Sequence, residues 1–152
     1  MKQELARFRV YPDGKSRYFT CILFRSRAAM VRFYGTLGTA DRDKMMRKGF
    51  DACVCPITST RMIGEKSVHK LPSLGYILFW KCAVGYPNQA HEMTHAALAF
   101  FRRCGKNSDV HIPDSNEEHG RTKEESFAYI VGDLMEQFSD GLRKRGLHIE
   151  VS

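Results

Sequence analysis

The hydrophobic positions in the first part of the chain fall in short runs that are typical of β-strands. Residues 6–11 and 17–24 are rich in β-branched and aromatic side chains, and residues 12–15 between them have the composition of a turn. This pattern predicts a β-hairpin. Two later segments, residues 50–62 and 74–84, also have strand composition, and the second gives the clearest strand signal in the chain.

Apolar residues recur at helical spacing in three other segments. Residues 26–37 predict a short amphipathic helix that crosses the hairpin. Residues 89–104 follow a proline and end at Gly105, which is the usual composition of a helix start and stop. Residues 122–145 predict a longer helix that stops at Gly146.

The order of these elements predicts an α+β fold. We expect a small N-terminal antiparallel or mixed sheet with a crossing helix, followed by two helices. The chain has 152 residues, the usual length of one domain, so we expect residues 1–152 to form a single domain. Residues 39–48 are charged and predict a loop or a helical turn, and residues 106–120 predict a loop.

The composition is that of an ordinary globular protein, with 43% hydrophobic and 27% charged residues. The net charge of the chain is +7, and the basic excess lies in the first half, because residues 1–80 contain 15 Lys and Arg against 6 Asp and Glu and so carry +9. Such a half attracts nucleic acid, acidic proteins or anionic surfaces, although many basic faces are only solvated. Charge is therefore a secondary indication of function.

Cysteine usage and the start of the chain indicate a reducing compartment. The five cysteines lack the paired spacing of a zinc ribbon, so we expect free, partly buried thiols. We expect the side chains of Cys53 and Cys55 to point to opposite faces of a strand and to be poor ligands for a shared metal. The first residues lack the apolar core of a signal peptide, and no apolar run is long enough to cross a bilayer. These features predict a cytoplasmic protein that does not enter membranes.

The first of the two C-terminal helices contains His91-Glu92-Met93-Thr94-His95, an H-E-x-x-H motif. Histidines four residues apart lie one above the other on a helix, so one Zn²⁺ ion can accept a nitrogen from each. Glu92 lies on the adjoining flank, near a metal-bound water. The alternative is a partly exposed polar face without metal. The glutamate and the small and apolar residues around the motif favour zinc.

A third ligand is expected from the last helix. Glu125 is the first candidate, because it aligns with the small residues Ala128 and Gly132, which would let two helices approach closely. Glu125 also fits a capping box that begins at Thr122, in which its carboxylate only bonds the helix start. A helix that starts at Ser115 would free it to bind metal. The other candidates are Glu124, His111, His119 or an aspartate.

The motif, together with the string EESFAYIVG at residues 124–132, resembles the zincin superfamily of zinc metallopeptidases. It is most similar to the compact glutamate-liganded, gluzincin-like type, and looks like small phage and prophage proteins of this kind. The resemblance covers about residues 74–138, whereas residues 1–70 match no family that we can name. It implies a minimal zincin-like fold.

The resemblance also implies roles for individual residues. His91 and His95 would be zinc ligands, Glu92 the general base, and Glu125 the residue that completes the site. The chain lacks the third histidine of the metzincins, and Tyr129 stands where larger thermolysin-like enzymes have an aspartate. The third ligand and its surroundings therefore stay open.

Two histidines and one carboxylate leave the fourth position of zinc open for water, as in catalytic rather than structural sites. We therefore expect a zinc-dependent metallopeptidase in which Glu92 takes the water proton and returns it to the leaving amine of the peptide substrate. Residues 75–81, the strand before the motif, are expected to offer an exposed edge to which an extended peptide adds.

A second function from a different class is a non-catalytic basic binding module with a vestigial or structural metal site. Its partner would be nucleic acid or an acidic protein. A nucleic-acid surface combines cations with aromatic rings, and the first half offers Arg17, Tyr18, Arg25, Arg27, Arg32, Phe33 and Tyr34. The same rings can equally belong to the core. Salt-sensitive binding without retained zinc would favour this module, and Glu92-dependent cleavage would favour the peptidase.

Overall fold

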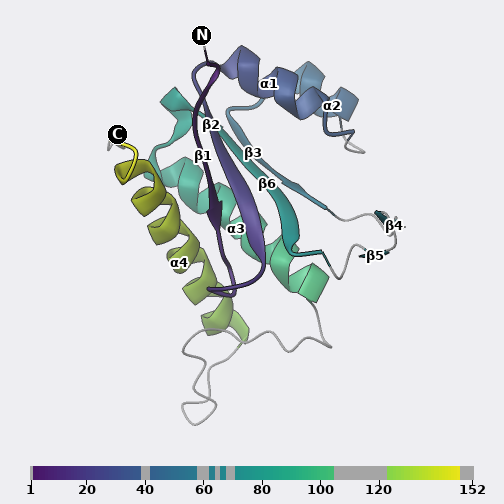
Figure 1. The fold of residues 1–152 in the computed structure, drawn as a ribbon, viewed down its shortest axis with the longest axis vertical. Coiled ribbons are helices and arrows are strands. Elements are labelled where there is room, and N and C mark those ends of the chain that lie inside the picture. The colour runs from purple at the N-terminus through teal and green to yellow at the C-terminus, as the bar shows by residue number, and fades with distance from the viewer. Residues whose placement is uncertain are drawn as a thin grey trace.

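The computed structural model describes residues 2–38, 42–57, 62–63, 66–67, 71–104 and 123–147. Figure 1 shows the elements that these residues form. The strands are β1 (Glu4–Val10), β2 (Tyr18–Phe24), β3 (Ala52–Pro56), β4 (Met62–Ile63), β5 (Lys66–Ser67) and β6 (Ser73–Trp80). The helices are α1 (Arg27–Gly35), α2 (Arg42–Lys48), the short 3-10 helix η2 (Lys81–Ala83), α3 (Tyr86–Cys104) and α4 (Lys123–Arg143).

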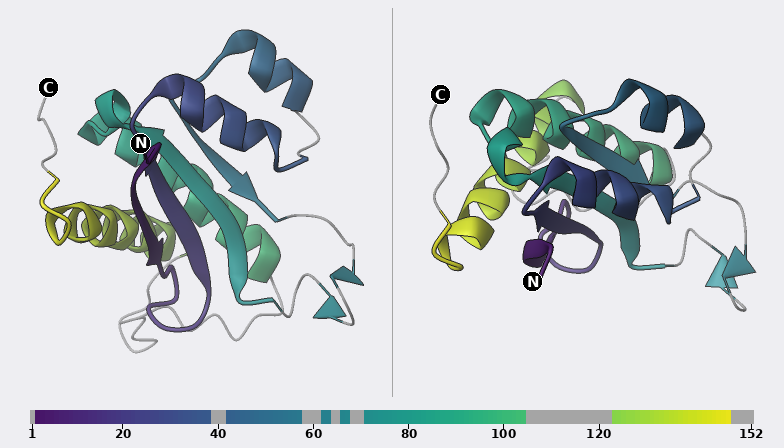
Figure 2. Two further views of the ribbon diagram at one scale, coloured as in Figure 1. Left: turned by 45° about the horizontal axis from the view of Figure 1, so that its top comes forward. Right: turned by 90° about the horizontal axis from the view of Figure 1, so that it is seen from above.

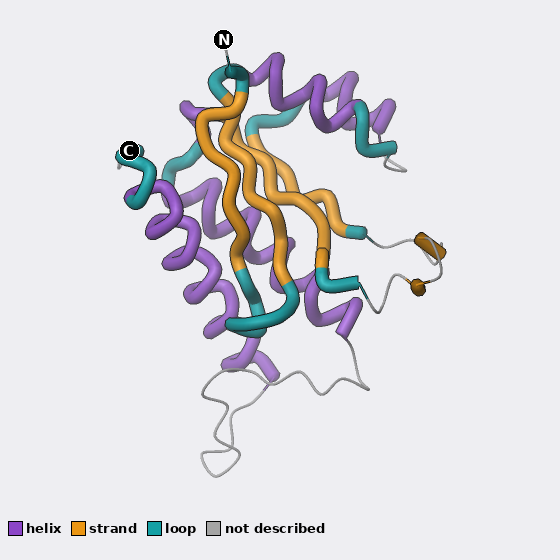
Figure 3. Tube along the Cα trace, viewed as in Figure 1, coloured by secondary structure: helices purple, strands orange, loops and turns teal. Residues whose placement is uncertain are grey.

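Four strands form one mixed sheet in the order β1-β2-β6-β3 (Figure 3). β1 and β2 form the predicted antiparallel hairpin, β6 is parallel to β2, and β3 is antiparallel to β6. β1 and β3 are therefore the edge strands, and β4 and β5 form a separate two-stranded sheet. The mixed sheet and its helices confirm the predicted α+β class.

The strand before the H-E-x-x-H helix has no free edge. Leu78 of β6 pairs with Ile22 of β2 on one side and with Cys53 of β3 on the other. The expectation that residues 75–81 would accept a peptide at an exposed edge was therefore wrong. The strong apolar run that marks this segment is typical of a central strand that is buried on both faces.

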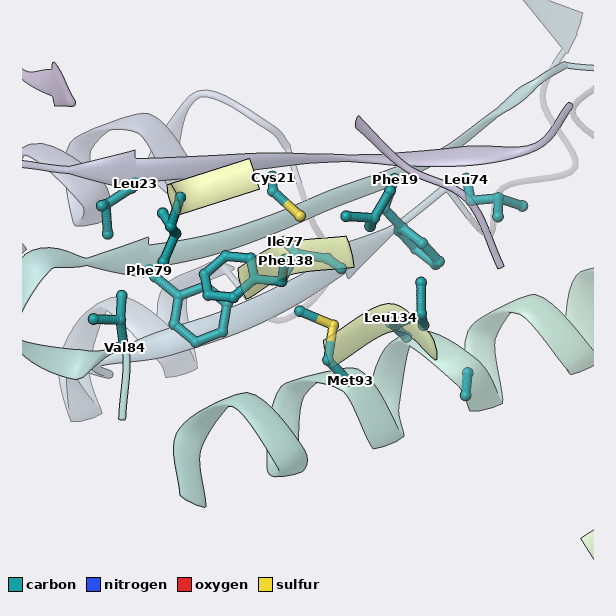
Figure 4. Packing of buried hydrophobic residues seen from close by; sticks show 14 of the residues in the cluster. Phe19, Cys21, Leu23, Leu74, Ile77, Phe79, Val84, Met93, Leu134 and Phe138 are labelled. Carbon is teal, nitrogen blue, oxygen red and sulfur yellow. The ribbon is translucent and has the colours of Figure 1, made fainter. Parts of the chain in front are cut away.

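Helices cover both faces of the sheet, but unequally (Figure 2). α1 lies on one face, where Met30 packs with Ile22 and Leu78. α3 and α4 lie on the other face and bury the larger core, part of which Figure 4 shows. This core joins helix residues to sheet residues, among them Met93, Leu134, Phe138, Phe19, Ile77 and Phe79.

Local signals set most of the boundaries. α1 begins after Ser26, whose side chain accepts a hydrogen bond from the Ala29 N–H at 3.2 Å. α3 begins at Tyr86, earlier than predicted, because a proline fits the first turn of a helix. β6 ends at Trp80 because η2 follows it, and α2 occupies the segment predicted as a loop or a helical turn. The predicted loop at residues 106–120 lies outside the described residues.

Two contacts hold α4 against β1. Gln137 Oε1 accepts a hydrogen bond from the Tyr11 N–H at 2.7 Å, and Gln137 Nε2 donates to the Tyr11 carbonyl at 2.9 Å. Gly141 allows close packing, because a Cβ at this position would lie 2.3 Å from the ring of Phe8. Neither α4 nor any other helix in the described ranges has the length and apolarity needed to cross a membrane.

Candidate metal centre

Hydrogen bonds at both ends tie α3 to the backbone just before and just after β6. At its start, Asn88 Nδ2 donates to the carbonyl of Ala83 at 3.1 Å, and Gln89 Nε2 donates to the carbonyl of Val84 at 2.7 Å. Near its end, the guanidinium of Arg103 donates to two backbone carbonyls at and just before the start of β6. These contacts fix the rotation of α3 about its axis, and hence the direction in which the motif points.

The motif residues divide between the buried and the exposed side of α3. Met93 and Ala96 are fully buried, and Figure 4 shows Met93 pointing into the core beneath the sheet. This burial confirms the prediction of a packed helix for Met93, Ala96 and Ala97, whereas Leu98 is exposed and lines the depression described below. His91 and His95 lie one turn apart on the exposed side, and Glu92 is buried on the flank between them and the sheet.

The two imidazoles of the motif converge. The Nε2 atoms of His91 and His95 lie 3.1 Å apart, and the ring centroids lie 4.7 Å apart. Two nitrogens on one tetrahedral zinc, each bound at about 2.0–2.1 Å, would be separated by about 3.3–3.4 Å. The pair therefore fits two ligand positions of a single zinc ion. It also fits a hydrogen bond from one Nε2–H to the other Nε2.

The surroundings favour the neutral form of His95. Burial lowers the pKa of His95, and the positive charges of His91 and Arg102 lower it further. Neutral imidazole is the form that binds a metal ion. Arg102 lies two helical turns after His95 on the same side of α3, and this seven-residue spacing is a sequence signal that the H-E-x-x-H motif does not include.

Glu92 is a buried carboxylate. The residue is only 7% exposed, and its Oε1 lies 3.9 Å from Nε2 of His91. Its side chain forms no hydrogen bond with the described part of the chain. Burial raises the pKa of Glu92, which the positive charge of His91 only partly offsets. A carboxyl group with a raised pKa accepts and releases protons more readily near neutral pH, which is what a general base requires.

A depression of about 480 Å³ opens beside the motif. Its walls come from Met45 of α2, from β3, and from the side of α3 that carries His91, Glu92, His95 and Arg102. Because β3 is an edge strand, the depression lies beside a row of backbone groups without a strand partner in the four-stranded sheet. The motif therefore faces a space that an extended chain can reach.

The structure does not bring Glu125 to the histidines. Glu125 is exposed in the first turn of α4, and no described residue of α4 lines the depression. Across the described ranges, no group of three or more His, Cys, Asp and Glu side chains is placed to hold a metal ion. The side chain of Glu124, residues His111 and His119, and both predicted helix starts lie outside the described residues. The third ligand stays a prediction.

The side of α4 that carries Glu125 faces away from the core. Ala128 and Gly132 are exposed, and no described atom lies within 4 Å of a Cβ added at Gly132. The prediction that these small residues allow two helices to approach closely was therefore wrong. α4 instead packs through its apolar stripe, which includes Ile130 and Leu134, because burial of this stripe sets the rotation of the helix.

Cys53 and Cys55 lie on the same face of β3, and the prediction of opposite faces was wrong. Residues two apart on a strand point the same way, and the two Sγ atoms lie 3.6 Å apart. Both side chains are buried in the cluster beneath α1 that contains Tyr34 and Phe50. The prediction of free thiols is confirmed for the cysteines that the structure describes, which are Cys21, Cys53, Cys55 and Cys82.

Comparisons with models of protein families, with curated proteins and with solved structures find no match to this chain. The resemblance to the zincins therefore rests on the motif and the residues around it.

Proposed function

We propose that the protein is a zinc-dependent metallopeptidase. The observation that supports this most is the convergence of the His91 and His95 Nε2 atoms beside the buried carboxylate of Glu92. Glu92 is only 7% exposed and borders the depression, so its carboxylate is largely desolvated, which costs free energy that an ordinary exposed carboxylate avoids. The similarity of the motif to that of the zincins supports the same assignment.

The chemistry follows from these three side chains. His91 and His95 would hold the zinc ion, and a zinc ion bound there would supply a Lewis acid for a peptide carbonyl and a water molecule. Glu92 accepts a proton from the attacking water as the water oxygen bonds to the carbonyl carbon. Glu92 then donates that proton to the amine nitrogen as the C–N bond breaks, so that one water is consumed for each bond cleaved. The raised pKa of Glu92 suits both transfers.

Glu125 is the proposed third ligand. Phe101 and Phe127, with ring centroids 5.9 Å apart, join the end of α3 to the start of α4, where Glu125 extends to solvent. Because the structure does not bring Glu125 to the histidines, this assignment rests on the resemblance to the zincins, in which two histidines and one carboxylate leave a position for water. Glu125→Ala should therefore weaken zinc binding, whereas Glu136→Ala, an exposed residue of the same helix, should not.

We assign the alignment of the substrate to β3 rather than to the strand before the motif. β3 is an edge strand and lines the depression together with His91, Glu92 and His95. An extended peptide that adds to this edge would run alongside the three motif side chains. Pro56 at the end of β3 has no N–H, so a ladder of hydrogen bonds to a peptide would end there.

The thiols support a location in a reducing cytoplasm. Cys21, Cys53 and Cys55 are buried and Cys82 is exposed, and all four are free. Exposed thiols persist most readily where cellular reductants keep them reduced. We therefore propose that the protein works in the cytoplasm.

Metal content and cleavage of an unstructured protein such as casein test the assignment. The wild-type protein should hold one zinc per chain. Glu92→Gln should keep the zinc and lose at least about 100-fold in cleavage rate, because only the proton carrier is removed. His95→Ala should lose the zinc, and Glu136→Gln, the matched control for a lost carboxylate, should behave as wild type. Loss of zinc from Glu92→Gln, or its unchanged cleavage, would contradict the role of Glu92.

A further inference from the structure

The described helices leave part of one sheet face uncovered. α1 covers the part of this face where Ile22, Phe24 and Leu78 are buried. Beyond α1, Figures 1 and 3 show the lower parts of β1, β2 and β6 with no described helix in front of them. We define the open face as the side chains that the strands and the rim of α1 present there, which are Arg7, Arg9, Tyr18, Thr20, Phe33 and Tyr76.

The strand register brings the side chains of the open face into line. Arg9 of β1 pairs with Thr20 of β2, and Thr20 pairs with Tyr76 of β6, so the three form a row across three strands. Tyr18 lies two residues before Thr20 on β2 and points to the same side. The guanidinium of Arg9 lies over the ring of Tyr18, with Cζ 4.0 Å from the ring centroid.

The rim of α1 adds another ring and brings it near a second arginine. Phe33 packs edge-on against Tyr76, with ring centroids 5.4 Å apart. Cζ of Arg7 lies 5.9 Å from the centroid of Phe33. Guanidinium groups and aromatic rings therefore alternate over the open face, and the rings of Tyr18, Phe33 and Tyr76 are all partly accessible to solvent.

The acidic residues near the open face leave Arg9 unneutralised. Glu4 pairs with Arg7 at 2.6 Å. Asp13 is engaged in the turn between β1 and β2, where it accepts hydrogen bonds from Ser16 and from neighbouring backbone N–H groups. No ion pair joins Arg9 to a carboxylate within the described ranges. The face therefore keeps positive charge in a half of the chain that is basic overall.

We propose that the open face binds single-stranded nucleic acid. Bases would stack on the accessible parts of the Tyr18 and Tyr76 rings, and phosphates would contact the guanidinium of Arg9, which unlike Arg7 has no carboxylate partner in the described ranges. Tyr18 and Tyr76 lie on adjacent strands and face the same side of the sheet, so successive unstacked bases can each reach one ring. The open face is on the side of the sheet opposite α3, so this binding does not depend on the proposed peptidase site.

The choice of a single strand rests on the rings. Half-buried rings on a sheet can stack only on bases that are not already stacked in a duplex. An acidic peptide would satisfy the arginines but would have no flat base to place on Tyr18 and Tyr76. Single-stranded nucleic acid is the anionic partner that uses both kinds of side chain.

The structure changes which residues belong to this surface. Tyr34, a sequence candidate, is buried with its ring against Phe50. Arg27 Nε donates a hydrogen bond to the carbonyl of Phe50 at 2.9 Å and lies near Asp51. Arg9 and Tyr76 were missed because they are far apart in the sequence and only the sheet register brings them together.

Fluorescence anisotropy with labelled oligonucleotides of about 20 nucleotides tests the proposal on the full-length protein. Mixed-sequence single-stranded DNA or RNA should bind at about 50 mM salt and lose most of its affinity by about 200 mM. A duplex of the same length and a polyglutamate peptide should bind at least about tenfold more weakly. Failure to bind single strands, or equal binding of the duplex or of polyglutamate, would overturn the proposal.

Substitutions of the two rings locate the site. Tyr18→Leu and Tyr76→Leu each remove a stacking ring and should weaken binding about tenfold. Tyr18→Phe keeps the ring and should bind like the wild type, which controls for a folding defect. Unchanged affinity in both leucine variants would show that bases do not stack on this face.

Substitutions of charge test the same surface independently. Arg9 is exposed, so Arg9→Ala should fold normally. It should weaken binding several-fold and reduce the slope of the log binding constant against log salt concentration by about one. Lys144→Ala removes an equal charge just after α4, on the other side of the sheet, and should change the affinity little. Glu92→Gln should bind like the wild type. An equal loss in Lys144→Ala and Arg9→Ala would mean that only the net charge matters, which contradicts a defined site.

Discussion

The two faces of the sheet differ in how completely the helices cover them. α3 and α4 seal one face with a continuous apolar core, and the H-E-x-x-H motif lies where this cover ends beside the edge strand β3. α1 covers only part of the other face, and the remainder carries arginines and half-exposed rings. The covered face should therefore account for most of the stability, whereas the rim of that face and the open face can bear function.

Removing a large side chain from the covered face should have the largest effect. The ring of Phe138 lies 4.8 Å from that of Phe79 and 5.7 Å from that of Phe8, measured between centroids. Phe138→Ala should lower the free energy of unfolding by about 3–5 kcal/mol in urea denaturation, because it leaves a cavity. Thr20→Ala on the open face should change it by less than about 0.5 kcal/mol. Similar losses of unfolding free energy in both variants would show that the two faces contribute equally to stability.

Two glycines lie on different sides of α4, Gly141 on its packed side and Gly132 on its exposed side. A methyl group at Gly141 would meet the ring of Phe8 at 2.3 Å, so Gly141→Ala should destabilise the fold by about 1–3 kcal/mol. Gly132 has no described atom within 4 Å of an added Cβ, so Gly132→Ala should stabilise by about 0.5–1 kcal/mol through helix propensity. Thermal unfolding can measure both, and a stabilising Gly141→Ala would be inconsistent with the observed packing.

Glu92, at the rim of the covered face, should lower the free energy of unfolding of the metal-free protein at neutral pH. The pKa of Glu92 is raised in the folded state, so folding favours its protonated form and stability falls as pH rises from about 4.5 through the raised pKa. Glu92→Gln should remove this loss and stabilise the chelator-treated protein on the order of 1 kcal/mol at pH 7. The gain should vanish below about pH 4.5. If Glu92→Gln is less stable than the wild type at pH 7, the buried carboxylate does not destabilise the fold as we expect.

The smallest effect is expected in the turn beside the open face. Burial raises the pKa of Asp13, but hydrogen bonds from Ser16 and the backbone N–H groups of Lys15, Ser16 and Arg17 outweigh this and lower it overall. The stability that Asp13 contributes is therefore present above its ordinary pKa near 3.8 and is lost as pH falls through the lowered value. Asp13→Asn should cost about 0.5 kcal/mol at pH 7 and less in acid. Glu136→Gln, at an exposed position in the middle of α4, is the control, and an equal effect there would remove any special role for the turn.

Local features of the fold could be predicted from the sequence because a few neighbouring residues determine them. The turn at residues 12–15, the cap at Ser26 and the apolar stripe of α4 gave the hairpin and the helices nearly in their observed positions. The motif likewise gave the convergence of His91 and His95, since helical spacing alone fixes it.

Features that depend on distant pairing could not be predicted. The apolar run of β6 indicated a buried strand but not that β2 and β3 would pair with both of its edges. The same strand order makes β3 the edge beside the motif and sets Arg9 in line with Tyr76. The rotation of α4, which turns Glu125 outward, follows from which apolar residues the rest of the core accepts. Each of these is a property of the assembled sheet rather than of a local segment.

X-ray absorption spectroscopy of the zinc-loaded protein tests the central claim most directly. If His91 and His95 share one ion, the spectrum should show two imidazole nitrogens among ligands at about 2.0–2.1 Å, with one zinc per chain. The His95→Ala variant should lose this signature along with the metal. Absence of bound zinc, or an unchanged spectrum in His95→Ala, would contradict the site on which the proposed peptidase depends.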